Sequence, residues 1–249
     1  MIEKAIRTTL RRLGYEITRT HQGLSSEESA ILAKVENFTM TSPQRLVGLM
    51  DAVRYVVYNQ IHGDLVECGV WRGGSMMAAA YSLDALNDRS RHLFLFDTFE
   101  GMPPPTEKDA LPNGVPAGSI LAATKRVEGP GIWAFASLED VKRNLMTTGY
   151  PPELVHFVKG DVRKTVPIQA PEKIAILRLD TDWYESTKHE LTYLYPRLVP
   201  NGVLIIDDYG HWKGSKEATD EYFSNFKFRP LLSRLDYTGR LFVKTQCHD

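Results

Sequence analysis

Five short apolar segments, rich in β-branched and aromatic residues, constrain the fold of this chain more than any other feature. They are DLVECGV (64–70), HLFLFD (92–97), LVHFV (154–158), IAILRLD (174–180) and VLIIDD (203–208). The later ones are apolar almost throughout, which is typical of strands buried on both faces of a parallel sheet. Segments with helical spacing of apolar residues alternate with them, at 45–61, 75–86, 137–147, 186–198 and 215–226. This alternation predicts an α/β fold.

The two ends of the chain predict additional elements. Residues 228–235 and RLFVKT (240–245) are expected to form a closing antiparallel pair at the sheet edge. At the other end, Ile2, Ile6, Leu10 and Leu13 recur at helical spacing. We therefore divide the chain into an N-terminal helical segment, 1–44, and a main domain, 45–249. The first helix is expected to dock on the main domain or on a partner subunit, with a membrane-surface helix as the alternative.

Composition excludes several classes of protein. Thirty basic residues balance thirty-one acidic ones, so a nucleic-acid binder with a broad basic field is not expected. No segment approaches the roughly 18 apolar residues that a membrane helix needs. The two cysteines, Cys68 and Cys247, form neither a metal-binding spacing nor a disulfide framework, which predicts a cytoplasmic protein.

Residues 100–135 are rich in proline and glycine and are too long for an ordinary loop. They follow the second predicted strand, so they are expected to lie over the carboxyl edge of the sheet, where ligands bind in open α/β folds. We interpret this insertion as a lid, with an insertion of no function as the alternative.

The segment ECGVWRGGS (67–75) joins the first predicted strand to the following helix. Glycines at such a turn let the backbone approach a ligand, and the helix N-terminus offers free N–H groups to an anion. Asp97 ends the second strand and can accept hydrogen bonds from both ribose hydroxyls of a nucleotide-like cofactor. Together these features predict an adenosine-containing ligand. The alternative is that Asp97 only caps a loop and the glycines only turn the chain.

Four aspartates follow the fourth and fifth predicted strands: Asp180, Asp182, Asp207 and Asp208. The carboxyl ends of adjacent parallel strands meet at one edge, so these side chains are expected to gather there. Unpaired carboxylates that close repel each other, and their burial is costly. A hard cation such as Mg²⁺ would relieve both problems. The alternative is ordinary capping, with solvent or a basic residue such as Arg178 as the partner.

Four segments together resemble motifs of the macrocin O-methyltransferase family: ECGVWRGGS, LFDTFEGMP, LRLDTDWYEST and LIIDDYGHWKG. The resemblance covers roughly residues 37–226. It implies a Rossmann-like class I methyltransferase fold, with a mainly parallel seven-stranded sheet and helices on both faces. It also implies an S-adenosylmethionine-dependent enzyme that methylates a sugar hydroxyl of a glycosylated small molecule in antibiotic biosynthesis. A bound Mg²⁺ (or Mn²⁺) and a homodimer are further implications.

The same resemblance assigns roles to individual residues. Those expected to contact the cofactor are Glu67 at the methionine amino group, Ser75 at its carboxylate, Gly69 beneath it, Asp97 at the ribose, Asp161 at the adenine edge, and Met40 and Thr41 over the methionine end. The expected metal ligands are Asp180, Asp207 and Asp208, and the expected general base is Asp182.

Other readings of the same residues remain open. His211 is an alternative base, because histidine titrates near neutral pH. A catechol-like phenol is an alternative acceptor, and a non-catalytic binding module is an alternative function. Tyr184 and Lys188 match the spacing of a short-chain dehydrogenase, although that class usually has serine where Pro171 stands. The aromatic side chains expected nearest to the metal are those of Trp183, Tyr184 and Tyr209.

Overall fold

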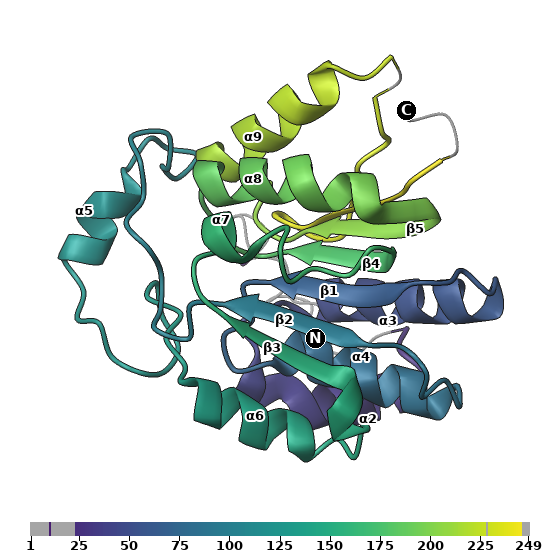
Figure 1. Cartoon of the computed structure of the whole chain (residues 1–249). Coiled ribbons are helices and arrows are strands. Elements are labelled where there is room, and N and C mark those ends of the chain that lie inside the picture. The colour runs from purple at the N-terminus through teal and green to yellow at the C-terminus, as the bar shows by residue number, and fades with distance from the viewer. Residues whose placement is uncertain (1–9, 11–22, 228, 246–249) are drawn as a thin grey trace.

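The computed structural model describes Leu10, residues 23–227 and residues 229–245. These residues contain a seven-stranded sheet with the order β3-β2-β1-β4-β5-β7-β6 (Figure 1). The strands are β1 (Asp64–Cys68), β2 (Leu93–Asp97), β3 (Val155–Lys159), β4 (Ile174–Leu179), β5 (Leu198–Ile206), β6 (Ser233–Arg234) and β7 (Arg240–Val243). Strands β1 to β5 pair in parallel, and β7 pairs antiparallel with both β5 and β6. The predicted parallel sheet and its antiparallel closing pair are confirmed.

Helices cover both faces of this sheet, as expected for the predicted fold (Figure 1). One face carries α2 (Ser26–Val35), α3 (Pro43–Tyr58), α4 (Gly74–Ala85) and α6 (Leu138–Met146). The other carries α7 (Val162–Thr165), α8 (Tyr184–Leu194) and α9 (Lys213–Ser224). Among the described residues, three short 3₁₀ turns lie at Glu36–Phe38, Pro152–Leu154 and Tyr195–Arg197.

Successive residues of the central strands point into two separate hydrophobic cores. In β1, Leu65 packs with α2, α3 and α4, whereas Val66 packs with α8 and α9 on the opposite face. Both side chains are fully buried. A strand buried on both faces has apolar residues at consecutive positions, which explains why the strand segments of this chain lack polar alternation.

Helix α2 shows where part of the N-terminal segment lies. It begins with a capping box, in which Ser25 accepts from the Glu28 N–H and the Glu28 carboxylate accepts from the Ser25 N–H. Ile31 and Leu32 are buried in the same core as α3 and α4. The expected first helix, at residues 2–13, falls almost wholly outside the described residues. The proposed dimer contact therefore stays a prediction.

The insertion at residues 100–135 lies at the carboxyl edge of the sheet, as expected (Figure 1). It contains the short helix α5 (Ala117–Ala122). Ala117 and Leu121 pack with Trp183 and Trp212 in a third, smaller hydrophobic cluster. The insertion is thus built onto the residues that follow β4 and β5. Its opening and closing as a lid stays a prediction.

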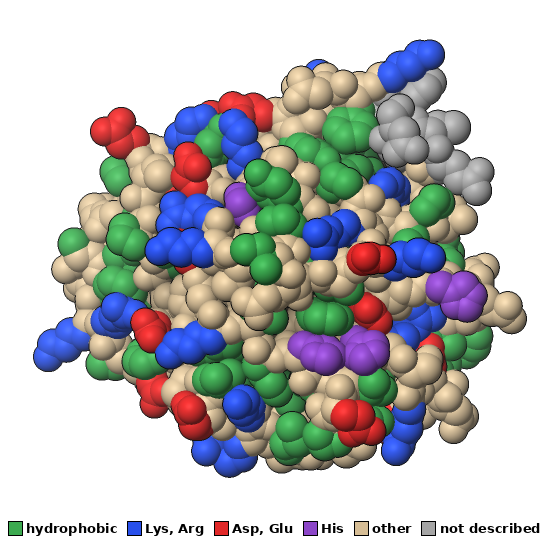
Figure 2. All heavy atoms as spheres, viewed as in Figure 1, with side chains coloured by type: hydrophobic (Ala, Val, Ile, Leu, Met, Phe, Trp, Pro, Cys, Tyr) green, Lys and Arg blue, Asp and Glu red, His purple; other side chains and the backbone are tan. Residues whose placement is uncertain are grey.

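The outer surface shows no segregation of charge on the face viewed in Figure 2, where basic and acidic side chains are interspersed. Among the helices of the described residues, none has the length and apolar character required to cross a membrane.

Candidate active site

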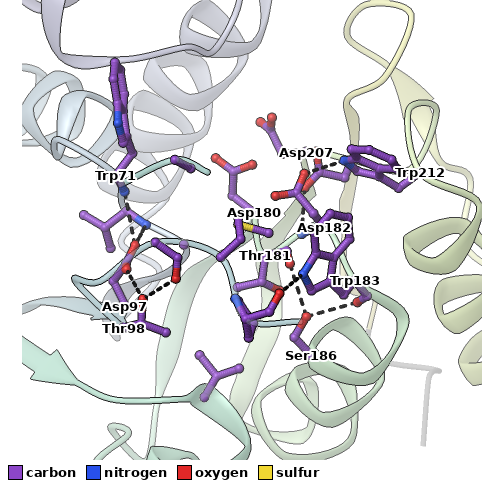
Figure 3. A pocket seen from close by; sticks show the side chains of 18 of the residues that line it. Trp71, Asp97, Thr98, Asp180, Thr181, Asp182, Trp183, Ser186, Asp207 and Trp212 are labelled. Carbon is purple, nitrogen blue, oxygen red and sulfur yellow. Dashed lines mark hydrogen bonds between the residues drawn. The ribbon is translucent and has the colours of Figure 1, made fainter. Parts of the chain in front are cut away.

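A cavity of about 280 Å³ opens at the carboxyl ends of β1, β2, β4 and β5. Its lining falls into two groups, which meet near Asp180 (Figure 3). We call the turn after β1, together with Asp97 and Asp161, the glycine-turn side. We call Asp180, Asp182, Asp207 and Asp208 the aspartate side. All of these aspartates line the cavity, so the predicted convergence at one sheet edge is correct.

Gly69 is required where the turns after β1 and β4 meet. Its φ of 82° lies in the left-handed region, and a Cβ built there would overlap the backbone carbonyl oxygen of Asp180. The absence of a side chain therefore lets these two turns touch. The packing of the two turns is by itself sufficient to require glycine at position 69. The role expected for Gly69 beneath a cofactor stays a prediction.

Asp97 ties the turn after β1 to the end of β2. One carboxylate oxygen, Oδ2, accepts from the Val70 N–H at 2.7 Å and the Trp71 N–H at 3.2 Å, and Oδ1 accepts from the Phe99 N–H at 2.7 Å (Figure 3). Burial raises the pKa of this carboxyl above its ordinary value. The Thr98 hydroxyl also donates to Oδ1, at 3.4 Å. Protein donors therefore already meet the roughly four acceptor positions of this carboxylate, which lines the cavity.

Glu67 is fully buried just beneath the cavity and is not among the described residues that line it. Its Oε1 accepts from Arg178 Nη1 at 2.6 Å, while its Oε2 has no hydrogen-bond partner. Burial raises the pKa of Glu67 to about 7, against the opposing effect of the Arg178 charge. A buried carboxylate oxygen without a donor is uncommon in folded proteins.

The other expected cofactor residues also lie at the cavity. Ser75, Met40, Thr41 and Asp161 all line it. The Thr41 hydroxyl accepts from Arg178 Nη2 at 2.8 Å, and Met40 Sδ accepts from the Gly131 N–H of the insertion at 3.4 Å. Asp161 caps α7 through the Arg163 N–H.

Asp180, Asp207 and Asp208 each offer one carboxylate oxygen within 4.8 Å of the others. Two guanidinium groups reach this cluster. Arg178 pairs with Asp180 at 2.6 Å and also with Asp207, and Arg45 pairs with Asp207. The sequence suggested Arg178 as a partner only in the alternative without a metal. Arg45 gave no such signal, since a single arginine on a predicted helix is usually solvated.

Asp182 is held beside this cluster by two contacts. Its Oδ1 accepts from Trp212 Nε1 at 2.7 Å, and its N–H donates to Asp208 Oδ2 at 3.2 Å (Figure 3). Its φ of 64° is unusual for a residue other than glycine and marks a site held by its surroundings. Burial and the nearby Asp180 charge raise the pKa of Asp182 to about 7. The sequence gave no reason to expect Trp212 as the donor.

His211 lines the cavity on the aspartate side, and its Nδ1 lies 3.3 Å from the Tyr237 hydroxyl. Burial and the Arg45 charge lower the pKa of His211. A neutral imidazole is therefore favoured at neutral pH, so the geometry keeps His211 available as an alternative base.

Three aromatic side chains were expected near the metal site. This prediction is correct for Trp183 and wrong for Tyr184 and Tyr209. Trp183 lines the cavity, whereas neither tyrosine is among the described residues that do. The Tyr184 hydroxyl donates to Glu221 of α9 at 2.5 Å and accepts from Lys188 at 2.6 Å. The first turn of α8 directs this ring toward α9, away from the cavity. The Tyr184–Lys188 pair therefore cannot act on a ligand there as a dehydrogenase pair would.

The strand order, the glycine turn and the acidic strand end on β2 define a class I methyltransferase fold. The chain belongs to the macrocin-O-methyltransferase family, whose family profile matches residues 16–244. Demethyldecarbamoylnovobiocin O-methyltransferase of Streptomyces niveus is 32% identical over 241 residues, covering 93% of this chain and 88% of that protein. Mycinamicin III 3''-O-methyltransferase of Micromonospora griseorubida is 35% identical over 201 residues, covering 81% of this chain and 76% of that protein. The solved structure of the O-methyltransferase NovP has a TM-score of 0.73 and 30% identity, covering 98% of both chains.

Proposed function

We propose that this O-methyltransferase transfers a methyl group from S-adenosylmethionine to a sugar hydroxyl of a glycosylated natural product. Asp180, Asp207 and Asp208 would hold Mg²⁺ or Mn²⁺, and Asp182 would act as the general base. The observation that carries this proposal is the contact between Asp182 and the acidic cluster, at the carboxyl edge of the sheet.

The glycine-turn side fits S-adenosylmethionine, which supplies an electrophilic methyl group when bound. The unpartnered Oε2 of Glu67 would accept from the methionine ammonium, and the N-terminus of α4 with Ser75 would bind the carboxylate. Asp97 would accept from the ribose hydroxyls, and Asp161 would contact the adenine. Met40 and Thr41 would close over the methionine end.

The aspartate side fits a hard divalent cation. Its four carboxylates are opposed by only two guanidinium groups among the described residues that contact them, those of Arg45 and Arg178. Burial, together with the Asp182 and Asp180 charges, raises the pKa of Asp208 well above its ordinary value. Carboxylate oxygens are the ligands that Mg²⁺ prefers. When bound, the cation would supply Lewis acidity toward the acceptor hydroxyl.

Asp182 would remove the acceptor proton, and the magnitudes show how far it can do so alone. A sugar hydroxyl has a pKa within a few units of water's, at roughly 15.7. Against a free aspartate near 3.9, full proton transfer would cost on the order of 16 kcal/mol. With the pKa of Asp182 raised to about 7, the gap falls to roughly 9 units, or about 12 kcal/mol. Asp182 alone therefore still leaves most of this cost, and the Lewis acidity named above would lower the pKa of the acceptor hydroxyl.

The acceptor class is inferred from the relatives. The name of the Micromonospora griseorubida relative specifies a 3''-hydroxyl. The name of a Streptomyces olivaceus relative, 35% identical over 201 residues, specifies a dimethoxyrhamnosyl tetracenomycin. A glycoside is therefore favoured over a catechol-like phenol. A cytoplasmic location and a homodimer remain part of the proposal.

Mass spectrometry of products from a panel of glycosides and phenols tests this function. The purified protein is incubated with S-adenosylmethionine, with and without a chelator, and Mg²⁺ is then restored. We expect methylated glycosides whose formation stops with the chelator and returns with Mg²⁺. Methylated phenols alone would support the alternative acceptor. Full activity in the chelator would contradict the metal requirement, and calorimetry with S-adenosylmethionine tests the cofactor separately.

A further inference from the structure

Asp109, in the insertion, has a fully buried carboxylate that lies outside the set of residues lining the cavity. Its Oδ2 accepts from the Thr106 N–H at 2.6 Å and from the Thr106 hydroxyl at 2.9 Å. Its Oδ1 accepts from the Tyr184 N–H at 2.8 Å. The sequence gave no indication of this residue, because an aspartate in a proline-rich loop is usually solvated.

The Asp109 carboxylate meets the first turns of both α8 and α9. Tyr184 is the first residue of α8, and no side chain of the preceding residue caps that helix. α9 likewise begins without a side-chain cap. A Cβ built on Gly214, in the first turn of α9, would overlap Asp109 Oδ1. The next residue of the insertion, Ala110, accepts from the Lys213 N–H at 2.9 Å. A carboxylate is stabilised at helix N-termini, where free N–H groups and the helix dipoles converge.

The residues immediately before these two helices are the tryptophans next to Asp182. Trp183 precedes α8 and Trp212 precedes α9, and their rings meet edge to face at 5.0 Å. Trp212 Nε1 donates to Asp182 Oδ1 at 2.7 Å, and Trp183 Nε1 donates to the Pro103 carbonyl oxygen of the insertion at 2.9 Å (Figure 3). A shift of either helix start would therefore move the groups that hold Asp182.

We propose that Asp109 is a positioning residue, which fixes the starts of α8 and α9 so that Trp212 holds the Asp182 carboxylate in its reactive orientation. This inference rests on the proposed function of Asp182. It gives the insertion a role that does not depend on the predicted lid motion, because a fixed part of this segment sets the geometry of the base. Misplacement of a reacting group by about 1 Å can cost on the order of 100-fold in rate.

Three variants test this positioning role. Asp109→Ala removes the carboxylate, and Asp109→Asn keeps an oxygen that can accept from the Tyr184 N–H. Gly214→Ala leaves Asp109 unchanged but places a methyl group where its Oδ1 lies. The matched control is Gly118→Ala in α5, where an added Cβ comes no closer than 3.8 Å to Pro105. The readouts are kcat, KM, calorimetric affinity for S-adenosylmethionine, and the near-ultraviolet circular dichroism of the tryptophan pair.

We expect Asp109→Ala and Gly214→Ala to lower kcat at least tenfold and to weaken the tryptophan dichroism. Affinity for S-adenosylmethionine should stay within twofold of the wild type. Asp109→Asn should recover most of kcat and of the dichroism, and Gly118→Ala should match the wild type. If Asp109→Ala does not fold, Gly214→Ala and Asp109→Asn carry the test.

The inference is overturned if Gly214→Ala keeps kcat within twofold of the wild type, or if kcat falls while the tryptophan dichroism stays unchanged. Asp182→Asn, measured in the same assay, separates this outcome from a failure of the proposed function. If Asp182→Asn turns over normally, the base assignment fails. If Asp182→Asn is inactive and the Asp109 and Gly214 variants are normal, only the positioning role fails.

Discussion

The glycine-turn side and the aspartate side of the cavity are built in different ways. On the glycine-turn side, Asp97 accepts hydrogen bonds from the backbone N–H groups of Val70 and Trp71, in the turn after β1, and of Phe99, two residues along the chain. On the aspartate side, Asp207 is paired with Arg45 and Arg178, which come from α3 and β4. The first side is fixed by backbone geometry, and the second by a balance of buried charges. We therefore expect the two sides to respond differently to substitution, to pH and to cations.

The largest expected effect is on the aspartate side. Asp182→Asn keeps an oxygen for Trp212 Nε1 but cannot accept the acceptor proton, so kcat should fall about 1000-fold. Affinity for S-adenosylmethionine and the thermal shift produced by Mg²⁺ should stay close to the wild type. Single-turnover assays, calorimetry and thermal melts measure these quantities. A normal rate would move the base assignment to His211, which His211→Ala would then test.

The next largest effect is a pH dependence of stability at Glu67. This residue pairs with Arg178, which also pairs with Asp180 of the aspartate side. The pKa of Glu67 is raised from 4.5 to about 7, so the folded chain favours the protonated form more than the unfolded chain does. This carboxyl therefore contributes stability below pH 4.5 that is lost as the pH rises through about 7. The full loss amounts to about 3 kcal/mol.

Glu67→Gln removes this titration. Its free energy of unfolding should therefore decline less than that of the wild type between pH 5 and pH 8, as measured by urea denaturation without added cation. The exposed substitution Glu153→Gln is the control and should follow the wild type. Parallel curves for Glu67→Gln and the wild type would show that this carboxyl does not titrate in that range.

A smaller effect is expected on the glycine-turn side. Asp97→Ala should raise the Kd for S-adenosylmethionine about 30-fold, which is about 2 kcal/mol, since hydrogen bonds to a charged group are lost. The Mg²⁺-induced thermal shift should be unchanged. Calorimetry and thermal melts also separate the two roles of Asp97, which are binding the cofactor ribose and tying the turn after β1 to the end of β2. A lowered Tm with unchanged Kd would show that the residue only ties the turns together.

The smallest effect is expected at the outer end of the same side. Asp161 forms a partly exposed ion pair with Arg163, and such pairs contribute little. Asp161→Ala should raise the Kd for S-adenosylmethionine about threefold, because only the adenine contact is lost. Arg163→Ala is the control and should leave the Kd unchanged. Equal weakening by both variants would instead implicate the ion pair.

The sequence by itself determined the alternation of strands and helices, and with it the edge of the sheet where Asp97, Asp180, Asp182, Asp207 and Asp208 meet. The physical reason is that strand periodicity and burial are local properties, and parallel strands must bring their carboxyl ends to one edge. It also offered Arg178 as a basic partner of these aspartates, in the alternative without a metal.

Only the tertiary structure decided which groups these side chains contact. The pairing of Arg45 with Asp207, the turning of Tyr184 toward α9 and the burial of Asp109 against two helix starts depend on how distant segments pack. An aspartate in a loop or an arginine on a helix gives the same local pattern whether it is solvated or buried. Packing of distant segments removes water from some of these groups and leaves others exposed, and this difference in solvation selects their partners.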